Sequence, residues 1–270
     1  MAAAGSQIVF RGIYAGTSGL PENGLTKQGF PCILQRKNAK KECDFMADVI
    51  AIDGPAASGK STVASKLADA LQIPYVNTGN MFRAAQAAGI TTAEACTDEN
   101  FAPVLAGLQM AYKRNSDGVF DLEVNGEFPG AALRAPEIAK LVSPVATVGS
   151  VRSFLKELQR SFAANGMLVM EGRDIGTVVF PDAKWKFFIT ATPEERARRR
   201  LAQSGENVSG ATLEEVARGI AERDRIDSTR AIAPLRPAED AEIIDTIIAV
   251  EKTLDVSAVT TEDFEITNVK

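Results

Sequence analysis

Short apolar runs alternate with longer amphipathic segments along most of the chain. Val49–Asp53 is one such run, and Met167–Glu171 and Lys186–Thr190 are apolar except at their ends. Runs of this kind are typical of strands buried on both faces of a parallel sheet. Two further strands are expected at Pro74–Asn77 and Ile243–Thr246. The pattern therefore predicts a five-stranded parallel sheet.

Helical segments separate these strands. They are expected from the turn after Asp53 to about Gln72, and at Gly79–Ala88, Pro136–Ala164, Pro193–Ser204, Thr212–Asp227 and Ile247–Leu254. Strands that alternate regularly with helices indicate a doubly wound sheet covered on both faces. We therefore expect a three-layer α/β fold.

One stretch departs from this rhythm. Gln109–Lys113 and Phe120–Val124 alternate apolar and polar residues around the turn-forming segment Asn115–Gly118. This pattern predicts a β-hairpin. It is best placed in a small inserted β-subdomain that covers about residues 101–135.

The first 46 residues differ from the rest of the chain. They hold six Lys and Arg against three acids, and they show no sustained helical or strand period. They also lack the apolar central run of a secretory signal. We expect residues 1–46 to be a disordered extension and residues 47–270 to form the folded domain.

The composition excludes several kinds of chemistry. The chain has no histidine, which excludes His-based nucleophile activation, a histidine general base and His-ligated zinc. Its three cysteines form neither a metal-spaced set nor a disulfide framework. A net charge of −5 does not suggest a nucleic-acid partner, and no apolar run is long enough to cross a bilayer. A cytoplasmic, monomeric protein is expected.

The segment Gly54–Ser61 matches the phosphate-binding pattern G-x-x-x-x-G-K-[ST] and lies between a predicted strand and a predicted helix. Its glycines allow backbone N–H groups to surround an anion, while Lys60 would reach the β- and γ-phosphates and Ser61 would bind Mg²⁺. The alternative, a strand-to-helix turn without a ligand, is weak for a complete motif in this context. The expected ATP contacts are Gly54, Pro55, Ala56, Ala57, Ser58, Gly59, Lys60, Ser61 and Thr62.

Three further polar segments point to a second substrate. Thr78–Arg83 places a hydroxyl and an arginine at a helix start, and Glu171–Gly176 follows a central strand, where ligands bind in such sheets. Arg223–Arg230 is dense in charge. Each has a structural alternative: a capped helix, a buried ion pair and a solvated helix face, respectively. Likewise, Arg196–Arg200 is either helix surface or a set of basic residues over the ATP phosphates.

Together, in this order, the motifs resemble the bacterial cytidylate kinases of the long-form type. The resemblance covers Asp48 to about Thr246 and rests on four segments: IAIDGPAASGKST at 50–62, NTGNMFR at 77–83, EGRDIGTVVFPDAKWKFFITATPEERARRR at 171–200, and ERDRIDSTRAIAPLRPAEDAEIIDT at 222–246. It implies phosphoryl transfer from ATP to CMP or dCMP with Mg²⁺, and a helical lid at about 198–230. A kinase for another nucleotide or small acceptor, and an ATP-binding regulatory protein without acceptor turnover, are the alternatives.

The resemblance also implies roles for individual residues. Lys60, Arg173 and Arg230 would be catalytic. The acceptor phosphate would be held by Thr78, Arg83 and Arg173, the cytosine edge by Ser143, Arg152 and Asp174, and the ribose by Arg223 and Asp227, with Arg230 closing the site. The chain departs from the common family pattern at three positions, with Glu171 and Asn77 where Asp is frequent and Phe82 where Tyr is frequent.

Overall fold

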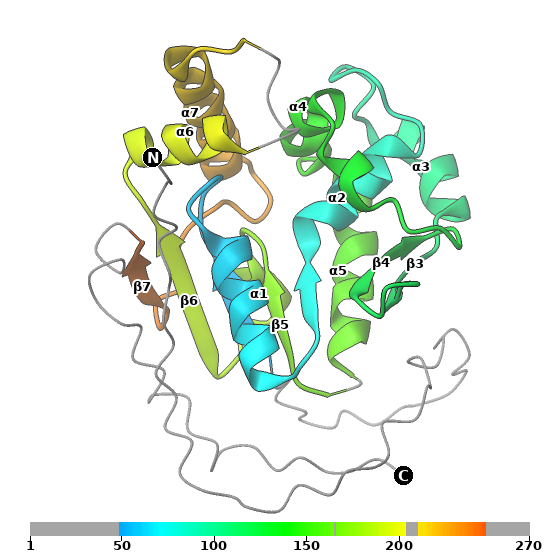
Figure 1. The fold of residues 1–270 in the computed structure, drawn as a ribbon. Helices are drawn as coiled ribbons and strands as arrows, with labels where there is room; N and C mark the ends of the chain where they lie inside the picture. The colour runs from blue at the N-terminus through cyan, green and yellow to red at the C-terminus, as the bar shows by residue number, and fades with distance from the viewer. Residues whose placement is uncertain (1–48, 165, 204–209, 247–270) are drawn as a thin grey trace, which may run out of the picture.

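The computed structural model describes residues 49–164, 166–203 and 210–246 (Figure 1). The expected N-terminal extension, residues 1–46, and the expected helix Ile247–Leu254 lie outside these ranges.

The main sheet has five parallel strands in the order β2-β5-β1-β6-β7. Their bounds are β1 Val49–Asp53, β2 Tyr75–Asn77, β5 Leu168–Glu171, β6 Trp185–Thr190 and β7 Glu242–Asp245. Each strand lies within one residue of its expected position. The predicted three-layer α/β fold with a five-stranded parallel sheet is confirmed.

Strand β1 is the middle strand of the sheet, and each of its residues is buried. Successive side chains of a strand point to opposite faces, so β1 contributes to two separate cores. Ile50 and Ile52 pack with helix α1 (Lys60–Leu71), whereas Val49 and Ala51 pack with the helices of the other face. Burying a large aliphatic side chain contributes about 1.5–3 kcal/mol, and this strand anchors the cores on both faces of the sheet.

The remaining helices cover both faces and the carboxyl edge of the sheet. They are α2 Thr78–Ala87, α3 Asp98–Gly107, α4 Pro136–Val145, α5 Gly149–Ala163, α6 Pro193–Ala202 and α7 Leu213–Thr229. In Figure 1, α6 and α7 lie above the loop that joins β1 to α1. Both helices therefore approach the edge where the strands end.

The prediction of a single helix at Pro136–Ala164 was wrong. The segment forms two helices, α4 and α5, which meet at 97°. Pro144 lies in the last turn of α4 and has no N–H for a helical hydrogen bond. The next residues close with short-range bonds instead, from Thr147 N to Pro144 O at 3.0 Å and from Val148 N to Val145 O at 3.1 Å. The amphipathic period continues across this break and hides it in the sequence.

Among the described residues, no single helix is long and apolar enough to cross a membrane, and only the bent pair α4–α5 passes that test of length and composition when its two helices are added together.

The predicted hairpin is confirmed as the antiparallel pair β3 (Met110–Arg114) and β4 (Phe120–Val124). The expected inserted segment is only partly β-structure, since α3 covers its beginning and a 3-10 turn, Gly130–Arg134, lies near its end. The start of α3 is capped by the Thr97 hydroxyl, which accepts from Asn100 N at 3.3 Å. The buried hairpin side chains belong to the same apolar cluster as β1, so the hairpin shares the main core.

Substitution of Gly54 tests how tightly the backbone is packed after the end of β1. A Cβ added there would lie 2.0 Å from the carbonyl oxygen of Ile189, and the residue has φ +145°. We expect Gly54→Ala to lower the free energy of unfolding by about 3 kcal/mol or more. The matched control is Gly219→Ala in α7, where an added Cβ meets nothing within 4 Å and helix propensity predicts a gain of about 0.5–1 kcal/mol. Urea unfolding of both variants measures the difference, and similar values for the two would contradict this account.

Candidate active site

The loop Gly54–Gly59 connects the buried strand β1 to helix α1. Gly59 has φ +96° at the helix start, and no side chain caps the first turn of α1. That turn also contains no acidic residue. An uncapped helix N-terminus presents backbone N–H groups and a positive dipole end, so this loop fits an anion.

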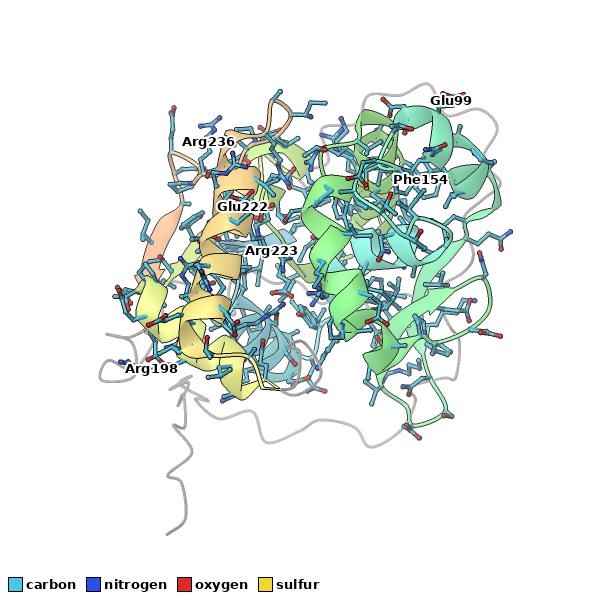
Figure 2. The ribbon with its side chains drawn as sticks, turned by 90° about the horizontal axis from the view of Figure 1, so that it is seen from above. Glu99, Phe154, Arg198, Glu222, Arg223 and Arg236 are labelled. Carbon is cyan, nitrogen blue, oxygen red and sulfur yellow. The ribbon has the colours of Figure 1, made fainter. Side chains whose placement is uncertain are left out.

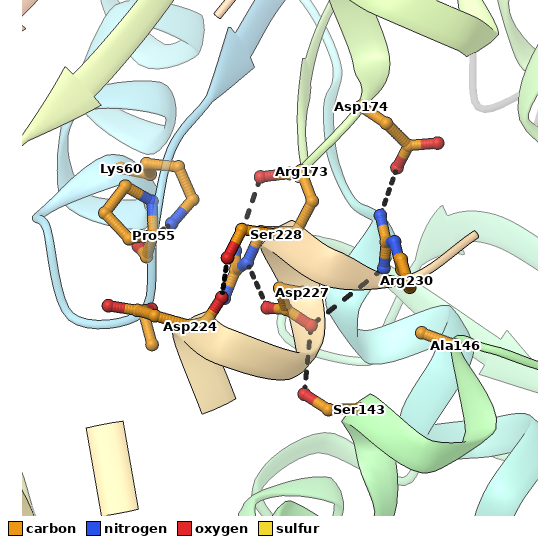
Figure 3. A network of polar contacts seen from close by, with 12 residues as sticks. Pro55, Lys60, Ser143, Ala146, Arg173, Asp174, Asp224, Asp227, Ser228 and Arg230 are labelled. Atoms are coloured by element: carbon orange, nitrogen blue, oxygen red, sulfur yellow. Dashed lines mark hydrogen bonds and ion pairs between the residues drawn. The ribbon is translucent and has the colours of Figure 1, made fainter. Parts of the chain in front are cut away.

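Lys60 lies at the first position of α1 and is buried. Its ammonium donates to the Pro55 carbonyl oxygen at 2.6 Å, across the loop (Figure 3). An ammonium has three N–H donors, so this bond leaves capacity for phosphate oxygens. Burial lowers the pKa of Lys60 well below its ordinary value, the positive charge of Arg173 lowers it further, and Glu171 opposes the shift.

Helix α6 contacts the same loop from above. Arg196 donates to the Ala56 carbonyl oxygen at 3.3 Å and pairs with Asp224 of α7 at 2.6 Å. Arg199 donates to the Ser58 carbonyl oxygen at 3.3 Å. By contrast, the side chain of Arg198 is 67% exposed. The run Arg196–Arg200 is therefore divided between loop contacts and surface.

Ser61 faces a buried carboxylate that the sequence did not single out as a site residue. The Ser61 hydroxyl donates to Glu171 Oε1 at 2.8 Å, and the Tyr75 hydroxyl donates to the same oxygen at 2.7 Å. The second oxygen, Glu171 Oε2, is buried and has no hydrogen-bond partner among the described residues. A hydroxyl and a buried carboxylate are ligands that suit Mg²⁺.

Asp53, at the end of β1, is a second buried carboxylate. It accepts hydrogen bonds from the backbone N–H groups of Ile175 at 2.9 Å and Gly176 at 2.8 Å. Burial raises the pKa of Asp53 to about 7, although the two N–H donors favour the charged form. These bonds join the start of the phosphate-binding loop to the segment that follows β5.

Arginines from four segments gather beside the loop. They are Arg83, Arg173, Arg200 and Arg223. Burial and then the charge of Arg173 lower the pKa of Arg223 to about 9, and burial lowers the pKa of Arg83 and of Arg200 to about 10, with neighbouring arginines adding to each shift. Figure 2 shows Arg223 on the side of α7 that faces α4, while Arg198 lies on the outer side of the helix pair. Gathered guanidinium groups at neutral pH form a site for phosphate.

Asp227 of α7 connects three segments of the site (Figure 3). It accepts from Arg173 Nε at 3.0 Å and from the Ser143 hydroxyl of α4 at 3.1 Å. Arg230 lies 3.9 Å from the same carboxylate. Although burial favours its neutral form, the surrounding arginines hold the pKa of Asp227 below its ordinary value. The carboxylate is therefore ionised at neutral pH.

Asp174 forms a second buried centre of charge. It pairs with Arg152 of α5 and, at 3.4 Å, with Arg230. Arg152 also donates to the Ala146 carbonyl oxygen at 3.1 Å, and its guanidinium lies 5.8 Å from the Phe82 ring centroid. Polar side chains and the aromatic ring of Phe82 therefore lie together around Arg152.

Most of the residues expected at the acceptor site thus form one connected network. Its members are Ser143, Arg152, Arg173, Asp174, Asp227 and Arg230. Thr78 donates instead to the Glu171 carbonyl oxygen at 2.7 Å, and Thr62 is exposed on α1. The sequence analysis missed Asp53 and Tyr75. The sequence signal for Asp53 is a polar residue at the end of a predicted strand, whereas Tyr75 lies inside a predicted strand and gave no signal.

A parallel sheet with a phosphate-binding loop after its central strand and a second, arginine-rich anion site beside it defines a P-loop kinase. The profile of the cytidylate kinase family matches residues 50–259. This chain is 47% identical to the cytidylate kinase of Pelotomaculum thermopropionicum over 73% of its length and 87% of that protein. It is 45% identical to the cytidylate kinase of Geobacter sulfurreducens over 77% of its length and 89% of that protein. The chain belongs to the cytidylate kinase family, as its motifs predicted.

The raised pKa of Asp53 predicts a pH-dependent stability. Between the ordinary carboxyl pKa of 3.8 and about 7, the folded protein holds a proton at Asp53 that the unfolded chain has lost. The contribution of this residue to the free energy of unfolding must therefore fall as the pH rises from 5 to 8. In thermal unfolding, the stability of the wild type relative to Asp53→Asn is expected to decrease over this range.

Asp240→Asn is the matched control for this titration. Its carboxylate pairs with Lys186 at 2.6 Å, and this hydrogen bond lowers the pKa of Asp240 below 3.8. Its stabilising contribution is complete above the ordinary carboxyl pKa, so the difference from the wild type is expected to stay constant from pH 5 to 8. Parallel curves for the wild type and Asp53→Asn would contradict the raised pKa.

Proposed function

We propose that this protein transfers the γ-phosphoryl group of ATP to CMP, and also to dCMP, by an in-line displacement that requires Mg²⁺. The observation that supports this most directly is that Lys60, Arg173 and Arg223 lie close enough together for the two guanidinium charges to lower the pKa of the lysine. The loop that fits ATP phosphates and the group that fits an acceptor phosphate are therefore neighbours. Direct transfer requires that adjacency.

The donor side would be held by the segment Gly54–Thr62. Its N–H groups and the α1 N-terminus bind the phosphates, and Lys60 neutralises charge that develops on the β- and γ-phosphate oxygens. Ser61 and Glu171 fit Mg²⁺, because a hydroxyl and an unsatisfied carboxylate oxygen meet at this point. When bound, the ion would neutralise negative charge on the phosphate oxygens.

On the acceptor side, Thr78, Arg83 and Arg173 would hold the CMP phosphate. Cytosine presents an amino donor next to acceptor atoms, and a carboxylate accepts from such an amino group. Asp174 provides the carboxylate, while Arg152 and Ser143 supply donors beside it. Arg223 and Asp227 would contact the ribose, and Arg230 would close the site.

Closure of the proposed lid, residues 198–230, would exclude water and add positive charge from α6 and α7. The segment at about 101–135 would support the acceptor side, since Tyr112 of its hairpin is bonded to Asn77 at the start of α2. The proposal further includes a monomeric, cytoplasmic enzyme without a nucleic-acid partner, consistent with the net charge of −5.

Lys60→Ala tests the donor side. The variant removes the ammonium that would stabilise the transferring phosphoryl group, and it is expected to lower kcat by about 10³-fold or more with the fold intact. Lys66→Ala, on the same helix, is the matched control and should retain wild-type turnover. A coupled ADP-release assay and circular dichroism measure both properties. Near-normal turnover by Lys60→Ala would refute the assignment.

Asp174→Ala tests which group reads the acceptor base. Loss of the carboxylate is expected to lower kcat/KM for CMP about 10- to 100-fold more than for UMP or AMP, since one base contact contributes about 1–3 kcal/mol of discrimination. The same coupled assay with a panel of nucleoside monophosphates measures the ratio. Equal losses for all acceptors would make Asp174 a structural residue, and a wild type inactive with every acceptor would refute the proposed kinase.

A further inference from the structure

Asn77 and Glu171, two residues that differ from the common family pattern, are both hydrogen-bonded to the Tyr75 hydroxyl group. Asn77 Nδ2 donates to the Tyr75 hydroxyl oxygen at 3.2 Å, and that hydroxyl donates to Glu171 Oε1 at 2.7 Å. The two departures, Asn77 and Glu171, are thus linked through Tyr75. They are 94 positions apart in the sequence.

The neighbouring groups determine the donor and the acceptor of each hydrogen bond in the series Asn77–Tyr75–Glu171. Asn77 Oδ1 caps helix α2 by accepting from Asn80 N at 3.1 Å, so the amide NH₂ group must face the other way, toward Tyr75. The phenol oxygen accepts from that amide, and its own proton is directed to Glu171. A phenol has an ordinary pKa of about 10 and therefore donates a hydrogen bond at neutral pH.

Two donors on a single oxygen constrain the orientation of the Glu171 carboxylate. Tyr75 and Ser61 both occupy Oε1, which leaves the buried Oε2 directed away from them and without a partner among the described residues. A buried carboxylate oxygen without a donor is costly unless a cation or an ordered water binds it. Mg²⁺ prefers oxygen ligands and usually retains water molecules between itself and a carboxylate.

We propose that Tyr75, held in place by Asn77, is a positioning residue that orients Glu171 and Ser61 for the Mg²⁺ of the nucleotide complex. This inference rests on the proposed function, because it requires a metal–nucleotide complex at Ser61. An aspartate at position 77 would cap α2 equally well. It would present an oxygen rather than an N–H to the phenol and would compete with Glu171 for the phenolic proton.

The test is Mn²⁺ binding to the full chain in the presence of ADP, followed by electron paramagnetic resonance, which detects the metal without turnover. Mn²⁺ replaces Mg²⁺ here because both suit carboxylate and water ligands. Tyr75→Phe and Asn77→Asp are each expected to raise the Kd for Mn²⁺ by about tenfold or more, as loss of such supporting hydrogen bonds does in other metal sites. The KM for CMP should change little in both variants.

Tyr112→Phe is the matched control. The Tyr112 hydroxyl also contacts residue 77, accepting from its N–H at 2.9 Å and donating to its carbonyl oxygen at 3.0 Å, and neither bond involves Glu171. This variant is expected to bind Mn²⁺ as the wild type does, even if its melting temperature falls. A matched loss of Mn²⁺ affinity in Tyr112→Phe would show general loosening of the site and would overturn the inference.

Two further outcomes are decisive. Wild-type Mn²⁺ affinity in folded Tyr75→Phe and Asn77→Asp overturns the positioning role and leaves the proposed kinase intact. If Tyr75→Phe does not fold, Asn77→Asp decides alone, because it keeps the helix cap. A wild-type protein that binds no Mn²⁺ with ADP overturns the metal-dependent function itself, and the positioning role with it.

Discussion

The carboxylate of Asp53 joins the two segments on which the whole site depends. It ends the central strand and accepts the N–H groups of Ile175 and Gly176, which begin the π-helical turn Ile175–Val179. A Cβ at Gly176 would lie 3.2 Å from the Lys186 side chain, so the backbone approaches closely here. The phosphate-binding loop starts immediately after Asp53, and Arg173 and Asp174 immediately precede Ile175. These two hydrogen bonds therefore hold the loop and the Arg173–Asp174 pair relative to each other.

Buried charge organises the arginine-rich side of the site. Asp227 and Asp174 are each contacted by two arginines, and together they connect α4, α5, α7 and the segment after β5. Buried ion pairs contribute little net stability, because removing both charges from water costs about as much as their attraction returns. Their contribution here is geometric. Arg152, Arg173 and Arg230 are held in defined positions, so little reorganisation is required when an anion binds.

Much of the fold follows from local sequence pattern. The five strands were predicted within one residue. The central strands β1 and β5 are buried apolar runs, whereas the edge strands β2 and β7 are short and partly exposed and were located by the alternation of strands with helices. The hairpin was predicted because period-two alternation flanks a turn. The break between α4 and α5 was not predicted, since the apolar period passes through Pro144 unchanged. Helix α3 was missed because most of its sequence was assigned to the inserted β-subdomain at about 101–135.

The site could be predicted only where its residues are contiguous. The loop Gly54–Thr62 is a single motif, and its chemistry could be derived from its own residues. Ser143 and Arg152 came from family resemblance alone, because in the sequence they are ordinary positions of a helical region. The contacts of Glu171 with Ser61 and Tyr75 span 110 and 96 positions, and those of Asp53 span 122 and 123. No local pattern encodes pairings at such separations; the parallel sheet creates them by bringing strand ends together.

The arginine run on α6 divides its side chains between the phosphate-binding loop, α7 and the surface. Its period places Arg196 and Arg199 against the phosphate-binding loop, where each donates to a loop carbonyl, and turns Arg198 outward. Arg200 lies near Arg223, and its positive charge contributes to the lowered pKa of that residue. Arg196 also holds Asp224, so α7 is tied to the same loop. Contacts of α6 and α7 with the phosphate-binding loop and with the arginine cluster are therefore made by one pair of helices that are joined by the Arg196–Asp224 ion pair.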